Sequence, residues 1–184
     1  MKTSSKRFTL IELLVVIAII GILAGLVFPA LGVVRNNAKK SKASSECQSL
    51  KTAIIMYESE FSCWPANVSS DAVVSSSDYV EMCKILTGKN SKKTVFFEVG
   101  VGYDENKGIL DPWGRPYQVA LDADYDGVLK EASIPAIKAV NSVNGRSGNL
   151  RTKVAVYSYG VKADDNDANN LNNLAKRKKL VISW

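Results

Sequence analysis

The sequence predicts an α+β protein in which one long N-terminal α-helix packs on a small antiparallel β-sheet head. An apolar run at residues 8–34 passes directly into an amphipathic helical stripe that continues to residue 61. A shorter helical pattern follows, and after it short β-prone segments are separated by turn signals. The 184 residues suit a single head domain, because they leave no room for a second domain of ordinary size.

The apolar run begins after a short basic leader at residues 1–7, MKTSSKR, and contains one charge, Glu12. About 20 apolar residues are enough for a helix to cross a bilayer, so we expect residues 8–34 to form the transmembrane or filament-core half of the helix. A plain anchor has no use for Glu12, since a carboxylate in a membrane helix is costly. Removing the leader would create an α-amino group at Phe8, a cation placed to neutralise such a carboxylate.

The leader followed by Phe-Thr-Leu-Ile-Glu at residues 8–12 and an apolar helix resembles the type IV pilin-like superfamily, which includes type IV pilins and type II secretion pseudopilins. The resemblance implies that a prepilin peptidase cuts between Arg7 and Phe8 and that Phe8 is N-methylated. It also implies that Glu12 pairs with the Phe8 amine of a neighbouring subunit during assembly. Pro29 matches the proline at which the family's helix bends or melts in filaments. The family usually has Gly before the cut, where this chain has Arg7.

Residues 35–62 form the amphipathic half of the predicted helix. Their apolar side chains recur at helical spacings of three and four and should pack on the head. These side chains are Ala43, Cys47, Leu50, Ile54, Tyr57 and Phe61. Trp64-Pro65 should end the helix, because the residue before proline disfavours the α conformation.

The head, residues 63–184, should begin with a Ser-rich loop at 66–77. A helix is then expected from Asp78, with Glu81 as its capping-box partner and Gly88 at its C-terminal end. Four short strands are expected to form the antiparallel sheet, with the Asp-Pro-Trp-Gly segment at 111–114 as a turn between two of them. The four expected strands are residues 94–99, 117–121, 153–159 and 180–184.

The segment DPWGRPY at residues 111–117 and the final strands resemble the major pseudopilins of type II secretion. This resemblance implies a structural subunit of a type II secretion pseudopilus, assembled with copies of itself and related pseudopilins into a filament that drives protein export. It would be a single-pass protein of the bacterial inner membrane, with a cytoplasmic N-terminus and a periplasmic head, in contact with the prepilin peptidase and the secretion platform. The alternatives are a type IV pilus subunit for adhesion, motility or DNA uptake, and a membrane-anchored calcium-dependent binding module.

The sharpest local motif is Asp122-Ala-Asp124-Tyr-Asp126-Gly127, which matches the start of an EF-hand calcium loop. Ser133 stands where an EF-hand has Glu, so a complete EF-hand is excluded. We expect either a calcium site formed by the three carboxylates and the Val128 carbonyl, or an Asp-rich turn without an ion. The major pseudopilins bind calcium near the C-terminus, which by resemblance makes a second candidate of Asp164, Asp165 and Asp167.

Composition excludes several other functions. The chain has no histidine, which rules out a Ser-His-Asp triad, a Cys-His dyad and His-ligated zinc, and no catalytic pair stands out, so we expect no enzyme. The formal charge of +6 comes with basic clusters that lack interleaved aromatics, so we expect solvated faces rather than a nucleic-acid site. Cys63 and Cys83 either form a disulfide in an exported head, or Cys47 and Cys83 are unpaired core thiols.

Overall fold

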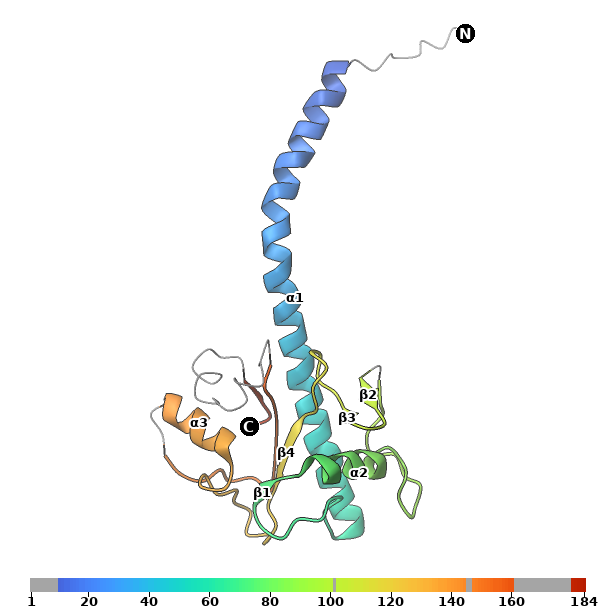
Figure 1. Cartoon of the computed structure of the whole chain (residues 1–184), viewed down its shortest axis with the longest axis vertical. Helices are drawn as coiled ribbons and strands as arrows, with labels where there is room; N and C mark the ends of the chain where they lie inside the picture. Colours follow the sequence, from blue (N-terminus) through green and yellow to red (C-terminus); the bar gives the residue numbers. More distant parts are fainter. Residues whose placement is uncertain (1–9, 101, 145–146, 161–179) are drawn as a thin grey trace. The chain divides into compact units, whose positions relative to one another are not determined.

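The computed structural model describes residues 10–100, 102–144, 147–160 and 180–184, with the backbone alone at 26–30 and 143. The chain separates into two compact units, Met1–Ala38 and Lys39–Trp184. Helix α1 (Leu10–Phe61) begins in the first unit and ends in the second (Figure 1). The predicted combination of a long N-terminal helix with a small antiparallel sheet is confirmed.

Helix α1 contains 52 residues and continues through Pro29. Phe8, at which we expected the helix to begin, lies outside the described residues. The helix ends where the sequence predicts: Ser62 adopts a positive φ of 54°, and its N–H donates to the carbonyl of Glu58 at 2.7 Å. Pro65 follows closely and prevents the helix from resuming.

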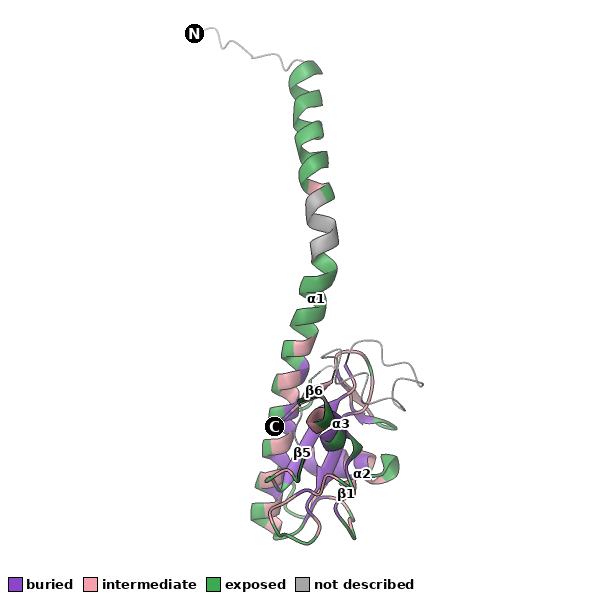
Figure 2. Ribbon diagram, turned by 90° about the vertical axis from the view of Figure 1, so that its left-hand side faces the viewer, coloured by how far each residue is buried: buried purple, intermediate pink, exposed green. Residues whose placement is uncertain are grey.

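In the first unit, the large apolar side chains of α1 between Leu10 and Leu23 are exposed (Figure 2). The most exposed are Leu10 at 81% and Ile11 at 69%. Within the described part of the chain, no helix combines the length and the apolar character that a membrane span requires.

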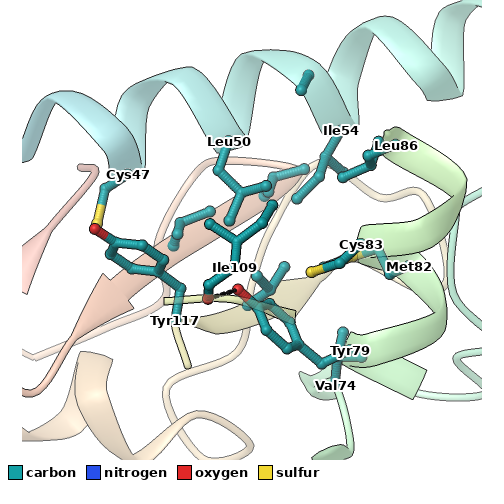
Figure 3. Packing of buried hydrophobic residues seen from close by; sticks show 14 of the residues in the cluster. Cys47, Leu50, Ile54, Val74, Tyr79, Met82, Cys83, Leu86, Ile109 and Tyr117 are labelled. Carbon is teal, nitrogen blue, oxygen red and sulfur yellow. Dashed lines mark hydrogen bonds between the residues drawn. The ribbon is translucent and has the colours of Figure 1, made fainter. Parts of the chain in front are cut away.

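In the second unit, α1 contributes the predicted apolar stripe to a buried core (Figure 3). Ala43, Cys47, Leu50 and Ile54 are fully buried, because each lies on the face that meets the head. Phe61, the last predicted member of the stripe, is only half-buried and stacks on Tyr57 with 4.5 Å between the ring centroids.

The sheet has four antiparallel strands in the order β1-β4-β5-β6. The predicted strands at 117–121, 153–159 and 180–184 are confirmed as β4 (Gln118–Leu121), β5 (Val154–Ser158) and β6 (Val181–Ile182). The fourth strand is β1 (Ala72–Val73), which pairs with β4 and lies in the segment that we predicted to be a loop. A strand of two residues is too short to show an alternating pattern in the sequence.

The prediction of a strand at 94–99 is wrong. The N–H groups of Phe96 and Phe97 both donate to the carbonyl of Leu86, at 2.9 and 3.1 Å, so this segment folds back on the end of helix α2 (Ser76–Leu86). The hairpin that follows, β2 (Tyr103–Asp104) with β3 (Gly108–Ile109), was not predicted.

Helix α2 begins two residues earlier than predicted. Its N-cap is Ser75, whose Oγ accepts a hydrogen bond from the N–H of Asp78 at 3.2 Å and donates one to the Asp78 carboxylate at 2.6 Å. Asp78, rather than Glu81, is therefore the acidic partner in the capping arrangement. The predicted C-terminal end is confirmed, since Gly88 follows the C-cap residue Thr87 with a φ of 107°.

The sheet is buried on both faces because its strands alternate between two apolar clusters. Val119 and Val156 point toward α1 and α2, whereas Ala120, Ala155 and Tyr157 point toward helix α3 (Pro135–Asn144). Helix α3 was not predicted. Its presence explains why β5 is buried along its whole length, a pattern that a sheet with one solvated face does not show.

The last described residues complete this core. The side-chain amide of Gln48 in α1 donates to the carbonyl of Ser183 at 2.9 Å. The N–H of Ser183 donates to the carbonyl of Val156 at 3.0 Å, and its Oγ accepts from the N–H of the same residue at 2.9 Å. Residues far apart in the sequence thus fix the C-terminal segment between β5 and α1.

Candidate functional site

The Asp-Pro-Trp-Gly segment forms the predicted turn, although it joins β3 to β4 rather than following a strand at 94–99. Asp111 is buried, and its Oδ1 accepts hydrogen bonds from the N–H groups of Trp113 and Arg115 at 2.9 and 3.0 Å. Its Oδ2 accepts from the hydroxyl of Ser158 in β5 at 2.5 Å. Gly114 has a φ of 85°, which glycine adopts without steric cost. The turn is therefore a structural element that sets the start of β4.

Strand β4 leads into the acidic loop, which we define as residues 122–130. The N–H of Asp122 donates to the carbonyl of Lys153 at 2.9 Å, which extends the β4–β5 pairing into the loop. Trp64, just beyond α1, donates its indole N–H to the carbonyl of Asp122 at 2.7 Å. Its ring also stacks on Tyr125, with 5.3 Å between centroids. These contacts attach the acidic loop to the core.

The three predicted carboxylates each hold the loop backbone with one oxygen. Asp122 Oδ2 accepts from the N–H of Gly127 at 2.7 Å, and Asp124 Oδ1 accepts from the N–H of Asp126 at 3.3 Å. Asp126 Oδ1 accepts from the N–H of Val128 at 2.8 Å. Each carboxylate therefore retains a second oxygen for another partner.

A fourth carboxylate, Asp71, joins this group and was missed from the sequence. Its Oδ1 accepts from the N–H of Ala123 at 3.0 Å, and its side chain is buried. The β1–β4 register pairs Ala72 with Leu121, so one further step along the antiparallel ladder brings Asp71 opposite Asp122. Nothing in the local pattern around Asp71 shows this, because the pairing joins segments about fifty residues apart.

Lys130 supplies the one ammonium that the described residues place among these carboxylates. Its Nζ lies 2.8 Å from Asp124 Oδ2, 3.4 Å from Asp71 Oδ2 and 3.9 Å from Asp126 Oδ2. The hydrogen bond from Lys130 lowers the pKa of the Asp124 carboxyl, and that carboxylate in turn raises the pKa of Lys130. Burial raises the pKa of Asp122, since its charged form is desolvated.

The other predicted site residues divide between described and undescribed segments. Glu12 is exposed in the first turn of α1, where the helix dipole favours a negative charge. Arg7 and Phe8 lie outside the described residues, and so do the second calcium candidates Asp164, Asp165 and Asp167. The structure places Pro29 within α1 and describes only its backbone.

All three cysteines are free. Cys47 and Cys83 are buried, and burial raises the pKa of their thiols to about 12 and about 11. Cys63 is exposed at the end of α1. The prediction that Cys47 and Cys83 are core residues is thus confirmed, and in this structure Cys63 and Cys83 are not joined.

Comparison with known proteins identifies relatives of the chain. A family model described as the prokaryotic N-terminal methylation motif matches residues 8–28. A fimbrial protein of Neisseria meningitidis is 39% identical over 92 residues, which are 48% of this chain and 54% of that protein. The type IV major pilin protein PilE of Neisseria gonorrhoeae is also 39% identical over 92 residues, 48% of this chain and 55% of that protein. The chain thus spans about half the length of these fimbrial relatives, and no solved structure matches it.

The type II secretion system core protein G of Aeromonas hydrophila is 34% identical over 123 residues, which are 64% of this chain and 74% of that protein. The chain belongs to the type IV pilin-like superfamily. The match is 123 residues long, whereas α1 has only 52 residues. The similarity to the secretion protein therefore includes part of the second unit of this chain.

Membership in the superfamily confirms the type of protein that the sequence predicts. The pilin-like relatives are structural subunits rather than enzymes, and subunits of this family form filaments of themselves. The methylation motif implies processing by a prepilin peptidase and suggests an N-terminal segment anchored in a membrane.

Proposed function

We propose that the chain is a structural subunit of a type II secretion pseudopilus, a filament that drives protein export. The match to core protein G carries this proposal, because it covers 74% of that protein and, at 123 residues, is long enough that it must include part of the head. The Asp-Pro-Trp-Gly turn, held by Asp111 at the start of β4, supports it, since this element resembles one in the major pseudopilins.

The proposed subunit assembles through the N-terminal half of α1. The exposed apolar side chains between Leu10 and Leu23 form a surface that water does not favour, which suits burial in a membrane or against copies of the same helix. Glu12 in this surface pairs with the Phe8 amine of a neighbouring subunit, and Pro29 is the point at which the helix adapts to the filament. Before assembly the chain crosses the inner membrane once, with its head in the periplasm.

Processing between Arg7 and Phe8 is the first expected outcome of this proposal. Mass spectrometry of chain purified from membranes should find N-methyl-Phe8 at the N-terminus. Loss of Lys2, Lys6 and Arg7 should lower the formal side-chain charge from +6 to +3. Arg7→Gly, which introduces the residue usual in the family, should be processed at least as fast, whereas Arg35→Gly, beyond the apolar run, should not change the rate. Intact Met1 in assembled material would contradict the proposal.

The second candidate is a type IV pilus subunit for adhesion, motility or DNA uptake. The specific observation that favours it is the 39% identity to the fimbrial protein and to PilE, which exceeds the 34% identity to core protein G. Those fimbrial matches cover a smaller share of the relatives, which is why the pseudopilus is preferred.

Deletion in the source bacterium separates the two candidates. For a pseudopilus subunit we expect exported proteins to accumulate in the periplasm while surface pili remain, because only the secretion filament is lost. Export should return with the wild-type chain expressed from a plasmid. Loss of surface pili with normal export would favour the type IV pilus subunit instead.

A further inference from the structure

We propose that Asp71, Asp122, Asp124 and Asp126 form a calcium site in which the ammonium of Lys130 competes with the ion. The site lies in the head, and the inference is independent of whether the filament is a pseudopilus or a pilus. It adds Asp71 and Lys130 to the three aspartates that the sequence motif indicates.

The carboxylates are oriented for a common ligand. In each of the four, one oxygen accepts a hydrogen bond from a backbone N–H of the acidic loop, which fixes the side chain without using its second oxygen. The second oxygens of Asp71, Asp124 and Asp126 lie within 4 Å of the Lys130 ammonium. The loop is therefore rigid before any ion arrives, which reduces the entropy lost on binding.

Two of these second oxygens are buried without a hydrogen-bond partner. Asp122 is fully buried, and its Oδ1 accepts no hydrogen bond. Asp71 is only 6% exposed, and its Oδ2 likewise accepts none, with Lys130 as its only cation among the described residues. Burying a carboxylate oxygen without a partner is unfavourable, and a cation shared by both would satisfy them together.

The spacing suits calcium. One oxygen from each of Asp71, Asp122 and Asp124 lies within 4.8 Å of the others. Two oxygens that bind one calcium ion from opposite sides are about 4.6–5.2 Å apart, twice the usual ligand distance. Calcium takes six to eight oxygens, so water and the Val128 carbonyl would complete the shell. Magnesium requires a smaller, near-octahedral shell and retains its water, so it should bind more weakly.

Lys130 neutralises only part of the negative charge of the four aspartates. One ammonium pairs with three of the four carboxylates, and the lysine side chain is 42% exposed. A divalent ion would supply twice that charge at shorter distances, while the flexible lysine could move into solvent without opening the core. Removing the lysine should therefore strengthen calcium binding, which distinguishes a metal site from an internal ion pair.

The experiment titrates the full-length chain in detergent with calcium chloride by isothermal calorimetry, and repeats the titration with magnesium chloride. We expect one calcium ion to bind, and magnesium to bind at least about tenfold more weakly. Lys130→Met should bind calcium about tenfold more tightly or better, and Asp122→Asn about tenfold more weakly or worse. Asp104→Asn is the matched control, since Asp104 also accepts two backbone N–H bonds in a turn but lies in the β2–β3 hairpin. It should bind like the wild type.

Tighter calcium binding by Lys130→Met cannot be explained by a folding defect, because a misfolded variant does not bind more tightly. Failure of both the wild type and Lys130→Met to bind calcium would overturn the proposal and leave the group as an ion pair. Binding that survives Asp122→Asn but disappears when Asp164 and Asp167 are replaced by Asn would also overturn it, and would place the ion in the later segment.

Discussion

Glu12→Gln should reduce filament assembly at least about tenfold while leaving the amount of membrane-inserted chain unchanged. The substitution removes the charge that offsets the Phe8 amine of a neighbouring subunit, and an uncompensated amine in an apolar interface is strongly unfavourable. Insertion should not suffer, since a neutral side chain enters a membrane more readily than a carboxylate. Sedimentation of sheared filaments, compared with the chain extracted from membranes, measures both quantities.

Two variants control the Glu12 experiment. Glu12→Asp keeps the charge on a shorter side chain and should recover part of the assembly. Glu60→Gln removes a carboxylate from the other end of α1, where Glu60 pairs with Lys92 in the second unit, and should assemble normally. Normal filament yield from Glu12→Gln would show that the charge plays no part in assembly.

Asp111→Ala should lower the free energy of unfolding by about 3–5 kcal/mol. The substitution leaves two backbone N–H groups and the Ser158 hydroxyl without their acceptor at a buried position. It also releases the turn that sets the start of β4 and removes the bond between that turn and Ser158 of β5. Denaturant unfolding of the full chain in detergent, followed by tryptophan fluorescence, measures the loss.

Asp104→Ala is the matched control for Asp111, because Asp104 also accepts two backbone N–H bonds but is partly exposed. Water can replace its carboxylate, so the expected loss is about 1 kcal/mol or less. Asp111→Asn retains an oxygen for the N–H groups and should fall between these values. Equal losses from Asp111→Ala and Asp104→Ala would show that burial adds nothing to the Asp111 bonds.

The sequence predicts those elements whose pattern extends over many residues. Helix α1 repeats its apolar spacing over several turns, β4 is apolar after Gln118, and β5 begins Val-Ala-Val. Strand β1 has only two residues, so no pattern can form. Helix α3 has a Ser- and Asn-containing sequence with weak helix propensity, and it is stabilised by packing on the second face of the sheet.

The candidate calcium site likewise combines residues that the sequence predicts with residues that only the fold brings together. Asp122, Asp124 and Asp126 lie close together because they are close in the sequence, and their alternate spacing identifies them. Asp71 is brought in by strand register, which depends on the β1–β4 pairing and therefore on the whole sheet. Lys130 contacts the carboxylates only because the loop turns back at Gly127, whose φ is 80°.

The hydrogen bond from Gln48 to Ser183 joins residues 135 positions apart, and this separation fixes the order of events during synthesis. Ribosomes add about 5–20 residues per second, so Gln48 precedes Ser183 by about 7–27 s. During that interval β5 is complete only once residue 158 has been added and β6 only at residue 182, so the sheet that covers the apolar stripe on α1 is still missing strands. The head can therefore complete its core only after translation has passed residue 183, and a factor that shields the stripe in the meantime would protect the chain from aggregation.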